Sequence, residues 1–205
     1  MKLATASADG FVRFYVAEDV MNLSVWSPQA PFEADSEGAS CLSWCQSKFD
    51  PQMIAVGFSG RKDDKVHAKV WGYQEDSRKW AVVAQLGGAR FSEAHTQPVH
   101  DVAWAPTVGR SYHLIATASK DRSLIIWKLT GFGPDSAPEL VHKFDLSAEV
   151  WRVEWNITGS VLASSGDDGI VRLWKQSLGG EWKCVTEIAS DGAGRGALAA
   201  GGGGG

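Results

Sequence analysis

Short runs in which apolar and polar side chains alternate, separated by turns, predict β-strands along most of this chain. The clearest case surrounds Asp168-Gly169, where a run of small apolar residues at 161–166 precedes the turn and an alternating run at 170–174 follows it. Asp-Gly between two such runs is the strongest short-range hairpin signal, because both residues tolerate the left-handed dihedral angles of a tight primed turn. We therefore expect a β-hairpin that closes on Trp174.

The same pattern occurs four times, at residues 3–15, 53–71, 114–127 and 161–174. In the first, third and fourth copies an Asp lies six residues before the closing aromatic side chain. The second copy carries a polar insertion at 59–65. The closing aromatics are 56, 56 and 47 residues apart, namely Tyr15, Trp71, Trp127 and Trp174. This spacing suits the four-stranded blades of a β-propeller with loops of variable length.

Further apolar runs flank each hairpin and complete the predicted blades. Innermost strands are expected at 40–44, 99–106 and 150–155, and outer strands at 22–26, 79–86, 139–146 and 181–188. The segment 27–39, with two prolines, and the Gly- and Pro-rich segment 130–138 are expected to be loops. The prediction is an all-β, open and incomplete propeller of about four blades over residues 1–189, whose first blade lacks its innermost strand. Residues 190–205, rich in Gly and Ala, are expected to form a disordered tail.

Composition and charge narrow the class of protein. With 205 residues, 44% of them hydrophobic and 21% charged, the chain can bury a large core. A net charge of −4 argues against direct binding of nucleic acid, which favours a basic surface. No run approaches the roughly 18 apolar residues that span a bilayer, and Met1-Lys2 leads directly into a strand, so we expect neither a transmembrane segment nor a signal peptide.

The cysteines predict neither disulfides nor a metal site. Cys41 and Cys45 lie on one predicted strand at a separation of roughly 13 Å, beyond the reach of about 7 Å for a disulfide. Cys184 lies far along the chain, so we expect all three thiols to be reduced. Neither His-x-His nor Cys-x-x-Cys occurs, and the sequence predicts no metal and no cofactor.

His95, Ser119 and Asp121 are the residue types of a nucleophilic triad, but their positions favour a structural role. His95 opens the third copy, Asp121 lies in its turn and Trp127 closes it. A buried hydrogen-bond chain through Thr117 or Ser119 would satisfy these polar groups. We therefore predict no catalytic residues and no enzyme, and expect the residues most important for folding to be His95, Asp121, Trp127, Asp168 and Trp174.

Several segments resemble one family specifically. The sequence VWRVEWNITG at 150–159, followed by VLASSGDDG at 161–169, closely resembles the Seh-type nucleoporins of the WD40 family. The resemblance extends from Leu3 to about Ile188, and the other segments that carry it are 3–10, 19–24, 98–101 and 109–111.

That resemblance implies a structural role. Members of the family form an open six-bladed propeller, and a helical-stack nucleoporin inserts one blade that closes the ring. The pair lies in the Y-shaped scaffold complex of the nuclear pore, at the nuclear envelope, and supports transport of protein and mRNA. Members also serve in a membrane-associated complex of nutrient signalling. This chain departs from the family because it holds about four blades and begins inside one of them, so we expect it to be a shortened form.

Two alternatives remain from the sequence. A vesicle-coat propeller would use the same open ring, although segments 21–24 and 156–159 favour the nucleoporin. A WD40 adaptor would read a short peptide on the narrow face of the ring, and Arg152 and Lys120 are its candidate residues. The sequence does not identify the side chains that bind a partner, and the charged segment 61–65 is expected to be a solvated loop tip.

Overall fold

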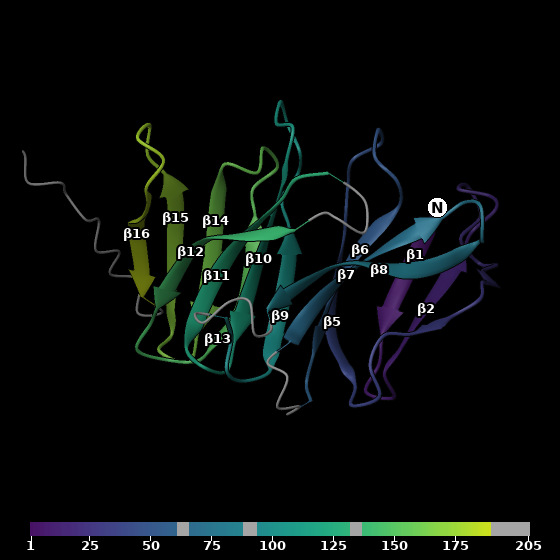
Figure 1. Ribbon diagram of the computed structural model, residues 1–205, viewed down its shortest axis with the longest axis horizontal. Coiled ribbons are helices and arrows are strands. Elements are labelled where there is room, and N and C mark those ends of the chain that lie inside the picture. Colours follow the sequence, from purple (N-terminus) through teal and green to yellow (C-terminus); the bar gives the residue numbers. More distant parts are fainter. Residues whose placement is uncertain (61–65, 88–93, 132–136, 190–205) are drawn as a thin grey trace, which may run out of the picture.

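The computed structural model describes residues 1–60, 66–87, 94–131 and 137–189. Sixteen strands form four antiparallel sheets that follow one another along the molecule (Figure 1). The second, third and fourth sheets each contain four strands in sequence order: β5 (Ala39–Trp44), β6 (Met53–Phe58), β7 (Val66–Gln74) and β8 (Lys79–Gly87); β9 (Val99–Trp104), β10 (His113–Ser119), β11 (Ser123–Leu129) and β12 (Pro138–Asp145); β13 (Val150–Trp155), β14 (Val161–Gly166), β15 (Ile170–Gln176) and β16 (Trp182–Ala189). The prediction of an all-β, incomplete propeller is confirmed.

The first sheet is irregular, and one predicted strand is wrong. It contains β1 (Lys2–Ala6), β2 (Phe11–Val16) and two short pieces, β3 (Ser27–Pro28) and β4 (Phe32–Glu33), which both pair with β2. The expected outer strand at 22–26 is a turn instead, in which Asn22 Oδ1 accepts the Ser24 N–H at 3.2 Å and offers the backbone a local partner. The two prolines of segment 27–39 are tolerated because the strand lies at the sheet edge.

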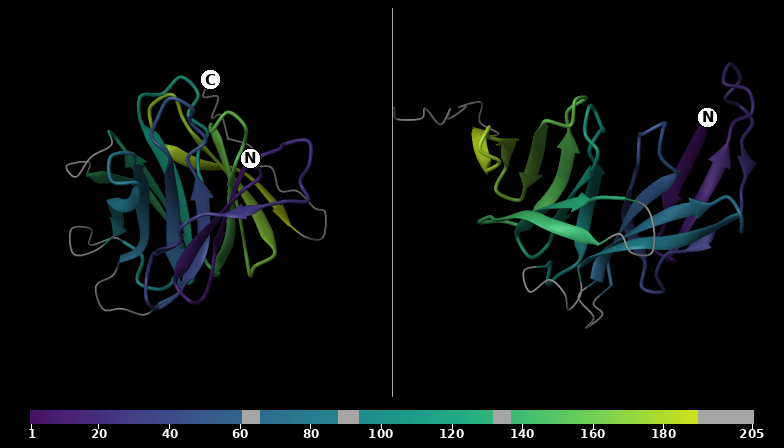
Figure 2. Two further views of the ribbon diagram at one scale, coloured as in Figure 1. Left: turned by 90° about the vertical axis from the view of Figure 1, so that its right-hand side faces the viewer. Right: turned by 45° about the horizontal axis from the view of Figure 1, so that its top comes forward.

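The sheets pack face to face, and the core lies between them. Three clusters of buried apolar side chains separate the first sheet from the second, the second from the third and the third from the fourth. Phe14 is buried in the first of these interfaces, Val70 in the second and Trp174 in the third. The two further views show the sheets fanned side by side in an arc (Figure 2). The second and third sheets contribute both faces to these clusters, so neighbouring sheets supply much of their burial.

The hairpin turns differ from the two-residue primed turn that the sequence predicts. In the fourth sheet the Gly169 N–H donates to Gly166 O at 3.2 Å, and Gly169 has a φ of 66°, whereas no positive φ occurs at Asp168. The turn therefore belongs to the longer type that ends on one left-handed residue. In the third sheet Arg122, with a φ of 66°, takes the left-handed place that Gly169 takes in the fourth.

Some expectations fall on residues outside the described ranges. These are the tip of the insertion at 61–65, most of the loop within 130–138 and the Gly- and Ala-rich tail at 190–205. Over the ranges that are described, there is no helix that could cross a bilayer.

Two glycines give a matched test of the turn geometry. Both Gly10 and Gly109 have positive φ, but a Cβ at Gly10 would lie 1.7 Å from Asp35 O, while a Cβ at Gly109 meets nothing within 4 Å. Gly109→Ala should therefore lower the free energy of unfolding only by the backbone strain, about 1 kcal/mol. Gly10→Ala should lower it clearly more, and the urea midpoint of unfolding measures both changes. Equal costs for the two variants would contradict the close approach of Asp35 to Gly10.

Candidate functional site

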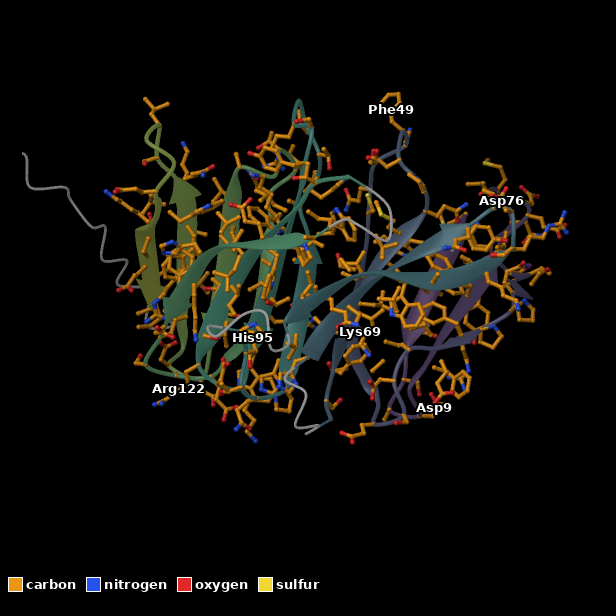
Figure 3. The ribbon with its side chains drawn as sticks, viewed as in Figure 1. Asp9, Phe49, Lys69, Asp76, His95 and Arg122 are labelled. Carbon is orange, nitrogen blue, oxygen red and sulfur yellow. The ribbon has the colours of Figure 1, made fainter. Side chains whose placement is uncertain are left out.

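A buried hydrogen-bond network fixes the third sheet to the segment that precedes it. His95 Nε2 lies 2.7 Å from Thr117 Oγ1, which also accepts the Trp127 Nε1–H at 2.9 Å. The other ring nitrogen, Nδ1, lies 2.9 Å from Ser123 Oγ and 3.2 Å from Asp121 Oδ2. Figure 3 shows His95 inside the lower half of the third sheet. The network thus joins a strand, a turn and the segment before the blade.

The structure places the sequence-predicted residues of this network as follows. His95, Asp121 and Trp127 come together, and Thr117 rather than Ser119 links them. Ser119 Oγ instead donates to Gln97 O and Pro98 O, at 3.0 and 2.9 Å. Because Ser119 is turned toward these backbone oxygens, it is not the nucleophile of a His95 base.

One member of the network was missed from the sequence. Ser123 Oγ donates to Asp121 Oδ1 at 2.6 Å and also contacts His95. Its position two residues after Asp121 is the signal that could have identified it, because an Asp in a turn commonly accepts from the residue two positions later. The Ser123 backbone N–H indeed donates to the same carboxylate oxygen, at 2.9 Å.

The pKa of Asp121 reflects this environment. Burial raises the pKa of the carboxyl, but hydrogen bonds from His95, Ser123 and the Thr96 N–H outweigh the burial and hold the pKa below its usual range. Asp121 is therefore ionised at neutral pH and acts as the acceptor at the centre of the turn.

In the first and fourth sheets an arginine takes the place of the histidine. Asp168 Oδ2 lies 2.7 Å from Arg172 Nη1, and Asp9 pairs with Arg13 in the same way, four residues along the chain. Trp174 Nε1 donates to Ser164 Oγ at 2.8 Å, as Trp127 does to Thr117. Asp168 and Trp174 thus belong to two separate contacts, whereas their third-sheet counterparts share one network. The importance of all five residues for folding remains a prediction.

One group of side chains has the residue types of a metal site, with two residues from the β5–β6 connection and one from β10. Cys45, Asp50 and His113 bring one ligand atom each to within 4.8 Å of one another. However, His113 Nδ1 accepts the Trp104 Nε1–H at 3.2 Å, so the ring proton belongs on Nε2, which lies 3.5 Å from Asp50 Oδ2. Burial also raises the pKa of the Cys45 thiol to about 11. Because Nδ1 accepts the Trp104 N–H and Nε2 faces Asp50, both nitrogens of the His113 ring have protein partners in this arrangement.

The cysteines are free thiols in the structure, as expected. Burial raises the pKa of Cys41 to about 12 and also raises the pKa of Cys184. A protonated thiol is a poor nucleophile. These pKa directions match the inert, structural role that the sequence favours.

The outward face of the fourth sheet has no neighbouring sheet among the described residues. Side chains that alternate with the buried Arg172 and Trp174 point away from the third sheet, and Val171 and Ile188 form a directly paired, exposed couple on this face. Val171 is 38% exposed and Ile188 is 43% exposed. At the other end of the molecule, β1 pairs with β2 along one edge, and no strand in the described part pairs with its other edge.

The two candidates for a peptide-reading face are placed differently. Arg152 has an 80% exposed side chain, but its Nη1 lies 3.8 Å from Asp101 Oδ2. The same Asp101 oxygen accepts the Val153 N–H at 3.0 Å, so the carboxylate joins neighbouring innermost strands β9 and β13. Lys120 lies in the exposed turn between β10 and β11.

The four radially packed sheets and their turn contacts define an open part of a β-propeller of the WD40 class. The family model of the WD domain, G-beta repeat, matches residues 89–128 and 138–175. Over 94% of this chain, the sequence is 44% identical to nucleoporin SEH1-A of Xenopus laevis, 43% identical to nucleoporin SEH1 of Homo sapiens and 42% identical to nucleoporin SEH1 of Danio rerio. The chain is thus a homologue of the SEH1 nucleoporins, and the resemblance found in its sequence is confirmed.

The chain spans about half the length of these curated relatives, 54% in each of the three. The similarity covers all four sheets, because 94% of the chain is aligned.

Loss of the Thr117 hydroxyl, which accepts from Trp127 and contacts His95, should destabilise the fold more than loss of the Ser164 hydroxyl, which accepts from Trp174. Thr117→Val removes the oxygen that serves both Trp127 and His95, and we expect a loss of about 1–3 kcal/mol in the free energy of unfolding. Ser164→Ala removes the acceptor of one bond, from Trp174, and should cost about 1 kcal/mol. Chemical denaturation of the two variants measures the difference, and a smaller loss for Thr117→Val would contradict the network.

The Asp121 carboxylate should make the free energy of unfolding fall at low pH. Its pKa is lowered in the folded state, so its contribution is complete above the unfolded pKa of about 4 and is lost as the pH falls through the folded pKa. The stability gap between the parent chain and Asp121→Asn should therefore narrow below about pH 4.

The matched control for this experiment is Asp145→Asn, whose parent carboxylate is 83% exposed. Its gap to the parent chain should change little over the same pH range. Denaturation at stepped pH measures both gaps, and a gap for Asp121→Asn that widens with acid would contradict the assigned direction.

Proposed function

We propose that this chain is a structural nucleoporin whose propeller accepts a blade inserted by a helical-stack nucleoporin. The sequence similarity to SEH1 nucleoporins supports the nucleoporin role. In this proposal the chain works within the Y-shaped complex of the nuclear pore at the nuclear envelope, and assists transport of protein and mRNA by building the pore. A second use, in a nutrient-signalling scaffold, follows from the same family resemblance.

The observation that carries the proposal is the uncovered apolar face of the fourth sheet. Every other interface between sheets buries an apolar cluster, yet Val171, Val185 and Ile188 are between 38% and 43% exposed. Apolar sheet faces and unpaired strand edges attract further strands. An inserted blade would cover this face as the third sheet covers the opposite one.

The described residues also favour a binding role over catalysis. Ser119, His95 and Asp121 are each occupied by structural hydrogen bonds. In this proposal the chain acts through an interface, without a small-molecule substrate or cofactor.

A vesicle-coat propeller is the second candidate, since a coat protein could use the same open face. The SEH1 relatives favour the nucleoporin. The peptide-reading alternative is less well supported, because Arg152 already lies beside Asp101.

Charges placed on the open face should prevent insertion. We expect the double variant Val171→Asp with Ile188→Asp to lose association with the helical-stack nucleoporin at least about a hundredfold, because central apolar contacts are often worth about 2 kcal/mol each. Light scattering after size exclusion of the co-expressed pair measures the association.

Leu178→Asp is the control, because Leu178 is fully exposed at the β15–β16 turn, away from the sheet face. Its association should match that of the parent chain. Unchanged association of the double variant, with its fold intact by circular dichroism, would contradict blade insertion at this face.

A further inference from the structure

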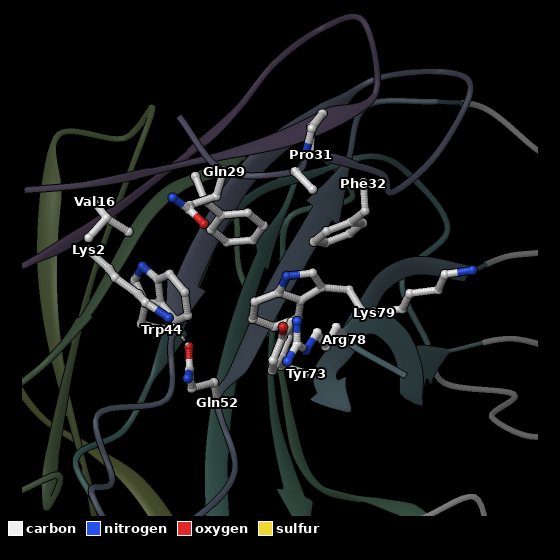
Figure 4. Close-up of a pocket in the computed structure, with 13 residues that line it drawn as sticks. Lys2, Val16, Gln29, Pro31, Phe32, Trp44, Gln52, Tyr73, Arg78 and Lys79 are labelled. Carbon is white, nitrogen blue, oxygen red and sulfur yellow. Dashed lines mark hydrogen bonds between the residues drawn. The ribbon is translucent and has the colours of Figure 1, made fainter. Parts of the chain in front are cut away.

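A cavity of about 480 Å³ opens between the first and second sheets. Its walls come from segments far apart in the sequence: Lys2 on β1, Gln29 between β3 and β4, Trp44 at the end of β5, and Tyr73 near the end of β7 (Figure 4). The volume lies within the range of pockets that bind small ligands or single side chains, about 300–1,000 Å³. It is distant from the open face of the fourth sheet (Figure 1).

Five of the thirteen residues that line this cavity are aromatic. Phe14 stacks on Trp80 with ring centroids 4.9 Å apart, and Trp44 meets Trp80 edge-on at 6.0 Å. Phe32 and Tyr73 complete the aromatic lining. Phe14 is buried, whereas the rings of Phe32, Trp44, Tyr73 and Trp80 are partly exposed. Partly exposed aromatic rings are a common anchoring surface for an apolar side chain of a partner.

The rim of the cavity is positively charged. Lys2, Arg78 and Lys79 line it, and none of the described lining residues is acidic, although the whole chain carries a net charge of −4. Lys2 Nζ donates to Gln52 Oε1 at 2.7 Å, and no salt bridge to these three cations occurs within the described ranges. The rim is therefore complementary to negative charge.

One of these cations lies in a hairpin turn. Arg78 is in the turn between β7 and β8 with a φ of 52°, as Arg122 is in the turn between β10 and β11, and these are the two positive values among described residues other than glycine. The chain thus reverses at Arg78, directly before the lining residues Lys79 and Trp80.

Two exposed apolar side chains belong to segments that also supply lining residues. Met21 is 94% exposed between the lining residues Val16 and Gln29, and Phe49 is fully exposed three residues before the lining residue Gln52. Figure 3 shows Phe49 and Asp76 on the upper side of the molecule, and Asp9 and Arg122 on its lower side.

We propose that this aromatic cavity binds a short acidic segment of a partner protein. One aromatic or branched aliphatic side chain of that segment enters the cavity, and flanking carboxylates pair with Lys2, Arg78 and Lys79. A cationic ligand is disfavoured by the positively charged rim, and an acidic segment with an apolar anchor uses both the rim and the aromatic walls, whereas an anionic membrane surface would use the rim alone. The site does not use the open face of the fourth sheet and stands independently of blade insertion.

Peptide display tests this proposal with the whole chain as the bait. Random short peptides are selected on the parent chain, and binding of the enriched peptides, labelled with fluorescein, is measured by fluorescence anisotropy. The key variant is Arg78→Glu with Lys79→Glu, which reverses the charge of the rim without touching the aromatic walls. The matched control is Lys120→Glu with Lys175→Glu, which makes the same charge change at exposed positions away from the cavity.

The expected peptides combine an apolar anchor with neighbouring acidic residues. Their affinity should fall at least about tenfold in the rim variant and change little in the control, since rim charges act locally at physiological salt. Peptides without acidic enrichment, or an affinity that survives the rim reversal, would overturn the proposal. So would loss of binding in the control variant alone, which would indicate the peptide-reading face near Lys120.

Vesicles containing phosphatidylserine supply the remaining arm of the test. Co-sedimentation with these vesicles that depends on Arg78 and Lys79, without peptide binding, would assign the site to a membrane surface and overturn the peptide proposal. Both double variants must keep the circular dichroism spectrum of the parent chain. Association with the helical-stack nucleoporin should be unaffected by the rim variant, so failure of this proposal and failure of blade insertion give different results.

Discussion

Face-to-face packing of sheets is the constraint on which this molecule depends. Each sheet has at least one apolar face, and that face gains its burial only when another sheet covers it. Three interfaces meet this requirement and hold the apolar core. Among the described residues, the first and fourth sheets at the two ends of the arc meet it on one face only. In the fourth sheet Trp174 is buried while Val171 on the opposite face is exposed. The proposed assembly role follows from that unmet requirement.

In three sheets a hairpin-turn carboxylate has a basic partner, but the residue that supplies this partner differs between the sheets. A carboxylate accepts backbone N–H groups in the turn and then needs a partner for its charge. Arg13 and Arg172 supply that partner four residues later, whereas the third sheet uses His95 from the preceding segment. The histidine solution connects the turn to Thr117 and Trp127 as well, so the third sheet is tied together more extensively.

The regular hairpins could be predicted from the sequence because period-two alternation and Asp-containing turns are local signals. The split outer strand β3 and β4 could not, since a strand broken by Pro31 resembles a loop until its pairing with β2 is known. The contacts among His95, Asp121 and Trp127 could be anticipated from their places in the repeat. The cavity at Trp44 and Arg78 could not, because its walls come together only when two sheets pack.

The most direct measurement is hydrogen–deuterium exchange of the chain, alone and with the helical-stack nucleoporin. If the open face accepts a blade, amide exchange should slow in β15 and β16 on addition of the partner, while the interior strand β10 changes little. Protection confined to the turn at Lys120 and to β13 near Arg152, with none in β15 and β16, would contradict blade insertion. That result would favour a peptide-reading propeller instead.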